Sequence, residues 1–91
     1  MQFEWDAGKA AVNLAKHGVA FDEALTCFFD PGQIAFHDPD HSEAEHRELL
    51  IGHSSRGRLL IVSHTMRRGT ARLISARKTT RREARTYAQG I

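Results

Sequence analysis

The second half of the chain carries the residue types that a reaction at a phosphodiester would use. Arg72 and Arg77 share one mostly apolar segment, His64 lies in the segment before it, and Glu83 and Tyr87 follow. Cleavage of RNA by its own 2′-hydroxyl needs a proton acceptor, a proton donor for the leaving 5′-oxygen, and positive charge beside the phosphorane. Arginine can supply the charge, and histidine, glutamate or tyrosine can move the protons, without a metal ion. These five residues are the candidate catalytic group.

Charge is distributed unevenly along the 91 residues. Residues 1–45 hold two lysines and nine acidic residues, a net charge of −7, whereas residues 46–91 hold eleven arginines and lysines and two glutamates, a net charge of +9. A basic half that is dominated by arginine favours bidentate contact with phosphate, so nucleic acid is the first candidate ligand. The basic residues that we expect to bind RNA are Lys9, Arg47, Arg58, Lys78, Arg81 and Arg82.

Several of these residues also have an ordinary structural interpretation. Arginines on strands are more often solvated or paired with a carboxylate. Thr80 and Glu83 have the spacing of a helix capping box, and Tyr87 lies one turn later, where it can anchor that helix to a sheet. We favour the structural role for Glu83 and Tyr87. Lys9 can equally be a surface lysine whose aliphatic stem lies along a helix.

A metal site is not expected. Five potential ligands gather in and after one polar segment, but their spacing matches neither H-E-x-x-H nor a paired-cysteine pattern, and such a segment is ordinarily solvated; they are His37, Asp38, Asp40, His41 and His46. Cys27 is the only cysteine, which excludes an internal disulfide, and its apolar neighbours predict a buried thiol. We expect no cofactor.

Length and hydropathy bound the class of protein. Ninety-one residues suffice for one hydrophobic core, so residues 1–91 are expected to form a single domain. No apolar run approaches the roughly 20 residues that span a bilayer. The N-terminus has neither the basic start nor the apolar stretch of a secretory signal, which favours a cytoplasmic protein without membrane contact.

The first third of the chain has mainly helical spacing. Phe3–Trp5 is a candidate edge strand, and Asp6 can cap a helix that runs to His17 and ends at Gly18. Its apolar stripe is predicted at Ala11, Leu14 and Ala15. A second helix is predicted over residues 23–29, capped by Asp22 and ended by Asp30-Pro31-Gly32, with Phe28 on its buried face.

The rest of the chain, after residue 32, has mainly the β-branched and aliphatic composition that is typical of strands. Four are predicted, over residues 33–36, 47–53, 58–66 and 70–78, with turns at 54–57 and 67–69 and a polar loop at 37–42. Leu50, Val62 and Ile74, or their immediate neighbours, should be buried in the middles of three adjoining strands. The capping box predicts a last helix to about Ala88. The result is an α+β domain with a mostly antiparallel sheet, two N-terminal helices and one C-terminal helix.

The pleat of a strand limits how the candidate arginines can cooperate. In a regular strand Arg72 and Arg77 point to opposite faces, because their separation is odd. Either Arg77 lies beyond the strand end or a bulge, or only one arginine meets the phosphate. A two-residue turn at Arg68-Gly69 would place Thr65 opposite Arg72 and His64 opposite Leu73, on the face of Arg77.

Nearly the whole chain resembles one known family, the BrnT toxins. Each motif is short, but their order along the chain is that of the family: Phe3-Glu4-Trp5-Asp6, Lys9, Asn13-Leu14, Lys16-His17-Gly18-Val19 and Phe21; then Asp38-Pro39-Asp40-His41-Ser42, Arg47 and Ile51-Gly52; then Leu73-Ile74-Ser75-Ala76-Arg77, Thr80, Arg82-Glu83 and Tyr87. His53 departs from the family, where a longer basic residue is common.

The resemblance implies a compact RelE-like fold and a ribonuclease that halts translation. It also implies neutralisation by a BrnA-like antitoxin, a ribbon-helix-helix protein that carries the contacts to operator DNA. Two other hypotheses fit the basic half of the chain: a non-catalytic nucleic-acid-binding regulatory module, and a partner-binding protein of this fold without activity. A proton-transfer group beside an arginine would distinguish the enzyme from both.

Overall fold

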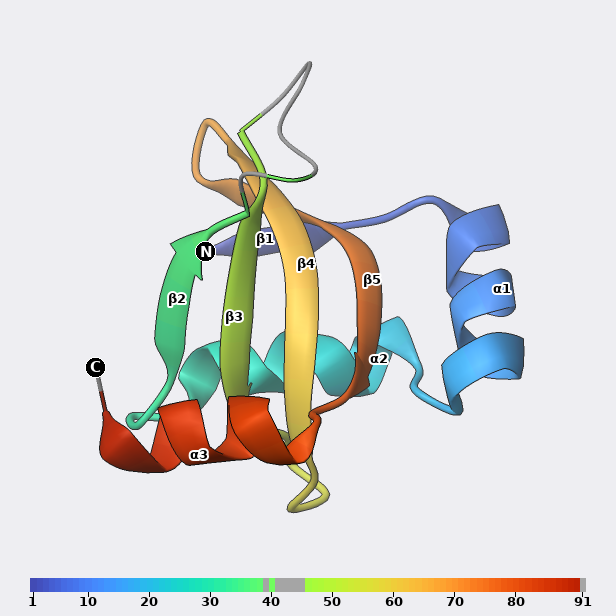
Figure 1. Ribbon diagram of the computed structural model, residues 1–91. Coiled ribbons are helices and arrows are strands. Elements are labelled where there is room, and N and C mark those ends of the chain that lie inside the picture. Colours follow the sequence, from blue (N-terminus) through green and yellow to red (C-terminus); the bar gives the residue numbers. More distant parts are fainter. Residues whose placement is uncertain (39, 41–45, 91) are drawn as a thin grey trace.

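The computed structural model describes residues 1–38, 40 and 46–90. One five-stranded sheet, in the order β1-β5-β4-β3-β2, is flanked by helices on both faces and at one edge (Figure 1). The elements are β1 (Gln2–Glu4), α1 (Ala7–His17), α2 (Phe21–Ala24), the 3₁₀ helix η1 (Leu25–Phe29), β2 (Ile34–His37), β3 (Glu48–His53), β4 (Leu59–Arg67), β5 (Thr70–Lys78) and α3 (Arg81–Gln89).

The sheet is mixed. Strands β2 to β5 form an antiparallel meander, and β1 pairs with β5 in parallel through only three residues. The α+β class is confirmed, whereas the mostly antiparallel description is incomplete because of β1. The predicted turn is present: Arg67 pairs with Thr70, and Arg68 and Gly69 have φ of 51° and 82°, as a tight hairpin turn requires.

Helix α1 has the predicted ends but a different buried face. The Asp6 side chain accepts from the Lys9 backbone N–H, and Gly18 ends the helix with φ 69°. The predicted stripe is wrong, because its three residues are exposed and Leu14 is 52% accessible. The side that faces β5 instead carries Asn13, which is buried. A buried polar residue is invisible to hydrophobic periodicity, which explains the error.

The second predicted helix is two short pieces. It begins earlier than expected, at Phe21, and Ala20 rather than Asp22 is the residue before its first turn, without a side-chain cap. After Ala24 the chain tightens into η1, which ends at Phe29 and is followed by Asp30. Cys27 is fully buried there, as predicted, and burial raises the pKa of its thiol to about 12.

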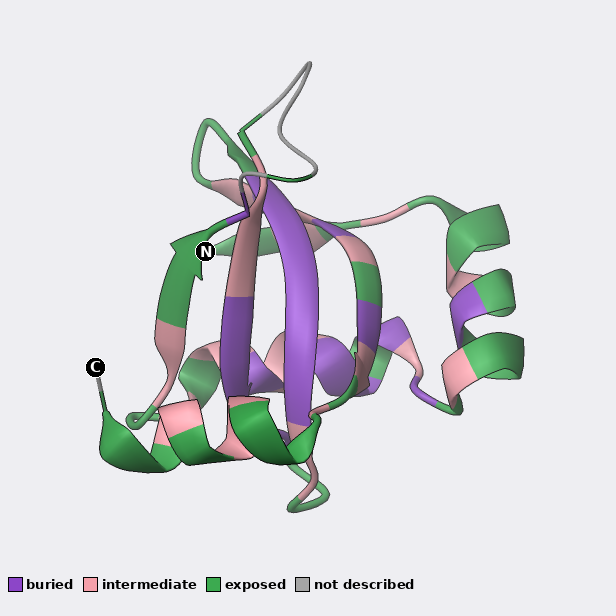
Figure 2. Ribbon diagram, in the orientation of Figure 1, coloured by how far each residue is buried: buried purple, intermediate pink, exposed green. Residues whose placement is uncertain are grey.

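The faces of the sheet are covered by different helices. On one, here called the inner face, α2 and η1 pack over Leu50, Val62 and Leu73, and Phe28 is packed against this core (Figure 2). Leu50 and Val62 are buried as predicted, and Leu73 takes the place of its neighbour Ile74. Helix α3 crosses the other, outer face near the lower ends of β3 and β4 (Figure 1). None of the helices in the described parts of the chain could span a membrane.

Candidate active site on the outer face of the sheet

A β-bulge in the middle of β5 decides which side chains share a face. Thr65 pairs with Arg72 and His64 with Leu73, as the two-residue turn predicted, but Ser63 pairs with Ser75. Ile74 is therefore the extra residue in β5. An extra residue shifts the alternation of side chains by one, so residues that lie an odd number apart across it point to the same side.

The bulge brings Arg72 and Arg77 to the same face. Both point to the outer side of the sheet, and the Ser63–Ser75 pair lies between their rows. Of the alternatives that the pleat left open, the structure shows the bulge, with Arg77 still inside the strand. The guanidinium groups remain partly accessible, with 33% of the Arg72 side chain and 41% of the Arg77 side chain exposed.

The same bulge separates His64 from Arg77, which corrects the expectation that they share a face. His64 lies on the inner face beside Leu73 and is only 2% exposed. Its ring packs edge-on against Phe28, with 4.8 Å between ring centroids, and its Nε2 is 3.6 Å from a carboxylate oxygen of Glu48. Burial lowers the pKa of His64, which favours the neutral ring.

A groove of about 390 Å³ lies over the centre of the outer face. Leu49, Ser63 and Ser75, which are paired across β3, β4 and β5, line it. Ile74 also lines it, together with two arginines and two carboxylates, which are Arg47, Arg77, Asp38 and Asp40. The groove thus combines cations that suit a phosphate with carboxylates that can accept or return a proton.

Arg77 is held at the groove by the first turn of α3. Its Nη1 and Nη2 donate to Oε1 and Oε2 of Glu83, both at 2.9 Å. The pKa of Glu83 is lowered, chiefly by these hydrogen bonds from Arg77, and that of Arg77 is raised by the same contact. Glu83 also accepts from the Thr80 N–H and forms the predicted capping box. An ionised, fully engaged Glu83 positions Arg77 and is poorly suited to donate a proton.

Arg72 is paired with the edge strand. Its Nη1 donates to Glu4 Oε2 at 2.6 Å, and Glu4 lies beside it in β1. This pair is half exposed, and a guanidinium in such a pair can exchange a carboxylate for a phosphate at small cost.

Tyr87 lies away from the groove, in a cluster that ties α3 to β3 and η1. Its hydroxyl donates to Asp30 Oδ2 at 2.6 Å and is 3.1 Å from His53 Nδ1. Asp30 also accepts from the His53 backbone N–H, and this bond, with that from Tyr87, lowers the pKa of Asp30 to about 2. The hydrogen bond to Asp30 raises the pKa of Tyr87. This arrangement supports the anchoring role that the capping-box spacing suggested for Tyr87.

Arg58 is committed to an internal ion pair. Its Nε donates to Glu23 Oε2 at 2.9 Å, its Nη2 contacts Oε1 of the same carboxylate, and Ser54 Oγ donates to Oε2 at 2.7 Å. Only 6% of the Glu23 side chain is exposed. Of the other predicted RNA-binding residues, Lys78, Arg81 and Arg82 are exposed at the end of β5 and the start of α3.

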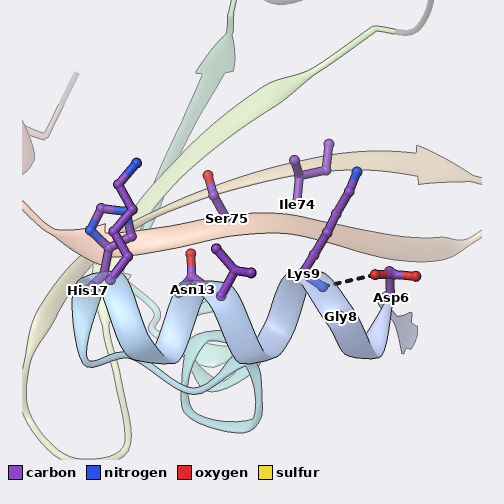
Figure 3. Close-up of a pocket in the computed structure, with 9 residues that line it drawn as sticks. Asp6, Gly8, Lys9, Asn13, His17, Ile74 and Ser75 are labelled. Atoms are coloured by element: carbon purple, nitrogen blue, oxygen red, sulfur yellow. Dashed lines mark hydrogen bonds between the residues drawn. The ribbon is translucent and has the colours of Figure 1, made fainter.

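A second groove, of about 500 Å³, lies between α1 and β5 (Figure 3). Lys9 and His17 stand near its two ends, and Lys16 also lines it. Ile74 and Ser75 line both grooves, so the bulge is the point where the two surfaces meet. The two grooves therefore meet at the bulge, with Lys9, Lys16 and His17 in the lining of one and Arg47 and Arg77 in the lining of the other.

No group of three or more potential metal ligands is found within residues 1–38, 40 and 46–90. The imidazoles of His37 and His46 stack with 4.3 Å between centroids, and His46 lies 3.4 Å from Glu48. His41, the remaining histidine of the segment considered for metal binding, lies outside the described residues.

Sequence reasoning missed several residues of these surfaces. The sequence did not indicate that the carboxylates of Asp38 and Asp40 share a groove with Arg77, or that Lys16 and His17 line a groove beside β5. Spacing offered a signal for the latter pair, because residues 9, 13, 16 and 17 fall on one side of a helix. The Asp30–Tyr87 contact joins positions 57 residues apart, and no local pattern indicated it.

Comparison with known proteins agrees with the resemblance seen in the sequence. The family described as "Ribonuclease toxin, BrnT, of type II toxin-antitoxin system" matches residues 5–83. The crystal structure of the Brucella abortus ribonuclease toxin, BrnT, is similar, with 25% identity and a TM-score of 0.67 over 89% of this chain and 99% of that one. None of the curated proteins compared with the chain matches it. Because the family match covers most of the chain, the chain belongs to the BrnT family of ribonuclease toxins of type II toxin–antitoxin systems.

Proposed function

We propose that this chain is an endoribonuclease that inhibits translation by cleaving RNA in the groove on the outer face, without a metal ion or other cofactor. The observation that carries the proposal is the β5 bulge, which turns Arg72 and Arg77 to the same side of the sheet and places Arg77 in the lining of that groove. Membership of a ribonuclease toxin family supports the reaction class.

Arg77 is the main catalytic residue of the proposal. The scissile phosphate lies over Ser63 and Ser75, and the guanidinium of Arg77 stabilises the negative charge that develops on the phosphorane. Glu83 keeps that guanidinium at the groove through its two hydrogen bonds. Arg72, in the row beyond the serines, meets the same or the neighbouring phosphate after exchanging its contact with Glu4.

Proton transfer is assigned to the carboxylates of the groove. One takes the proton of the 2′-hydroxyl as that oxygen attacks phosphorus. The same carboxyl group then returns the proton to the 5′-oxygen as its bond to phosphorus breaks, which yields a 2′,3′-cyclic phosphate and a 5′-hydroxyl. Asp40 is exposed at the groove, which makes it the accessible candidate. His64 is not used, because it lies buried on the opposite face, and Tyr87 is not used, because its hydroxyl is engaged by Asp30.

The RNA strand is proposed to run through both grooves, which meet at the bulge. Lys9 on α1 and Arg47 at the sheet groove contact phosphates on either side of the bulge, with Lys78, Arg81 and Arg82 as more distant contacts. Arg58 is left out, because its charge is neutralised by Glu23.

The biological partner is proposed to be a BrnA-like ribbon-helix-helix antitoxin, which covers the basic surface and alone contacts operator DNA. A family of type II toxin–antitoxin systems supports an antitoxin partner. We propose further that residues 1–91 form a single RelE-like domain that acts in the cytoplasm. Copurification of the tagged chain with the product of the adjacent reading frame tests the partnership, and failure to form a complex would contradict it.

Single-turnover cleavage of RNA by Arg77→Ala and Arg72→Ala tests the catalytic site. Loss of one donor to the transition state typically lowers the rate about 100- to 1,000-fold. A residue that only binds phosphate behaves differently: its loss weakens affinity and reduces the salt slope by about one, while the rate at saturating RNA stays the same. Arg85→Ala is the matched control, since this arginine is exposed, lines neither groove and has no role in the proposed site.

The non-catalytic binding module is the outcome that would replace the enzyme. If the wild-type chain binds RNA but never cleaves it, free or on ribosomes, the binding module is correct. If it cleaves and both arginine variants cleave at the wild-type rate, the chain is an enzyme with its site elsewhere.

A further inference from the structure

Asn13 is a buried polar side chain that joins α1 to β5. It is 5% exposed, and its amide makes three hydrogen bonds. Nδ2 donates to the backbone oxygens of Ala76 and Val19, both at 2.9 Å, and Oδ1 accepts from the Ala76 N–H at 3.0 Å. A side-chain amide that both donates to and accepts from one residue makes the two backbone hydrogen bonds that a neighbouring strand would otherwise make.

The position of Ala76 on the sheet explains why its backbone N–H and C=O need partners outside the sheet. Strand β1 pairs with residues 70–72 of β5, at the other end of the strand. At Ala76, the edge that faces away from β4 is covered by α1, and a buried backbone N–H or C=O without a partner is costly. Asn13 satisfies both groups of Ala76 at once.

The residue held by Asn13 lies between the bulge and the candidate catalytic arginine. Ala76 follows the extra residue Ile74 by two positions and directly precedes Arg77. The first half of β5 is held by its hairpin turn and by β1. If the second half slipped by one residue, the bulge would be lost and Arg77 would turn to the inner face. Asn13 is the contact that opposes this slip from α1.

We propose that Asn13 is a positioning residue for RNA cleavage: by binding both backbone groups of Ala76, it fixes the β5 bulge and so holds Arg77 in the outer-face groove. This inference rests on the proposed function, in which Arg77 stabilises the phosphorane. Asn13 acts through the strand, and Arg77 is the group that meets the substrate.

A double-mutant cycle between Asn13 and Arg77 tests the inference. Single-turnover cleavage at saturating RNA is measured for the wild type, Asn13→Ala, Arg77→Ala and the double variant. Because an arginine misplaced by about 1 Å costs on the order of 100-fold in rate, we expect Asn13→Ala to cleave about 10- to 100-fold more slowly with little change in KM. In the Arg77→Ala background, the same substitution should have almost no further effect.

Val19→Ala controls for a general loss of stability. It removes a buried side chain just beyond the end of α1 but keeps the backbone oxygen that accepts from Asn13. All variants are compared at a temperature at which circular dichroism shows each to be folded. We expect Val19→Ala to melt lower and to cleave at the wild-type rate.

Asn13→Asp provides a second readout that does not require the alanine variant to fold. The carboxylate still accepts from Ala76 N–H but faces two carbonyl oxygens without a donor, whereas the protonated acid regains one donor. Its cleavage rate relative to the wild type should therefore rise as pH falls.

The failures of the two proposals are distinguishable. Equal losses from Asn13→Ala with and without Arg77, an equal loss in Val19→Ala, or a pH-independent ratio for Asn13→Asp would each overturn the positioning role while leaving Arg77 catalytic. Wild-type activity in Arg77→Ala would instead contradict the catalytic role of Arg77. The positioning role of Asn13, which acts through Arg77, would then fail as well.

Discussion

Removal of the Glu23 carboxylate should destabilise the chain in a manner that depends on pH. Glu23 lies in α2 beneath the turn between β3 and β4, where it accepts from Arg58 and Ser54. The hydrogen bond from Arg58 is the main cause that lowers the pKa of Glu23 from its ordinary value of 4.5 to about 2, against the opposing effect of burial. The isosteric change Glu23→Gln removes the charge and keeps the volume.

The size of the effect follows from the difference in proton affinity between the folded and unfolded states. Each tenfold difference corresponds to about 1.4 kcal/mol, so a pKa that falls from 4.5 to about 2 on folding stabilises by at most roughly 3.5 kcal/mol at pH 7. Since 27% of the Arg58 side chain is exposed, solvent screening reduces this, and we expect a loss of about 1.5–3 kcal/mol. Each kcal/mol should lower Tm by about 4–8 °C.

The pH dependence separates the charge from simple packing. A carboxyl whose pKa is lowered in the folded state contributes stability above its unfolded pKa and loses it as pH falls through the folded pKa. The difference in free energy of unfolding between wild type and Glu23→Gln should therefore be full at pH 7 and shrink between about pH 4.5 and 2. Urea unfolding at pH 7, 5, 4 and 3 measures it.

Glu4→Gln is the matched control, because it removes a carboxylate from the more exposed pair with Arg72. Such a pair contributes about 0–1 kcal/mol. A destabilisation by Glu23→Gln that stayed constant from pH 7 to 3, or that was no larger than that of Glu4→Gln, would refute the reasoning and return Arg58 to the candidate RNA-binding residues.

Further substitutions examine other parts of the structure. Tyr87→Phe should lower the free energy of unfolding by about 1–3 kcal/mol, because it removes the hydrogen bond to Asp30, and leave single-turnover cleavage unchanged; a lost rate without lost stability would restore Tyr87 as a catalytic residue. Lys9→Ala should reduce the salt slope of RNA binding by about one while the cleavage rate at saturation stays the same, as titrations at several salt concentrations would show. Gly52→Ala should melt lower, because a Cβ would lie 2.8 Å from the backbone oxygen of Cys27; an unchanged Tm would contradict that close approach.

Local features of the sequence predicted most of the elements. Asp6 and Gly18 mark the two ends of α1. A side-chain oxygen and a left-handed glycine satisfy the free backbone groups at the ends of a helix, wherever that helix packs. Thr80 and Glu83 predicted the start of α3, and Arg68-Gly69 predicted both the turn and the pairs next to it. Each of these signals acts over a few residues, so it can be read without knowledge of the fold.

The candidate site depended on contacts between distant residues. The sequence supplied the arginines and the odd spacing between Arg72 and Arg77, but the bulge at Ile74 decided that they share a face. It also turned Arg77 away from the face of His64. Asn13, which binds Ala76 near the bulge, lies 63 residues away in the chain, so no local pattern indicates that the two positions meet.

The same reason explains the errors in the helices and the sheet. Periodicity predicted that Leu14 is buried, because apolar residues are usually inside. In the structure Asn13 is buried instead, because its amide binds the backbone groups at the edge of β5. Likewise β1 is too short for its direction to be encoded locally, and its parallel pairing with β5 depends on where α1 and the core leave an open edge. The sequence by itself thus determined the elements and the chemistry available, and tertiary packing determined which side chains meet, because unsatisfied backbone groups find their partners only in the assembled fold.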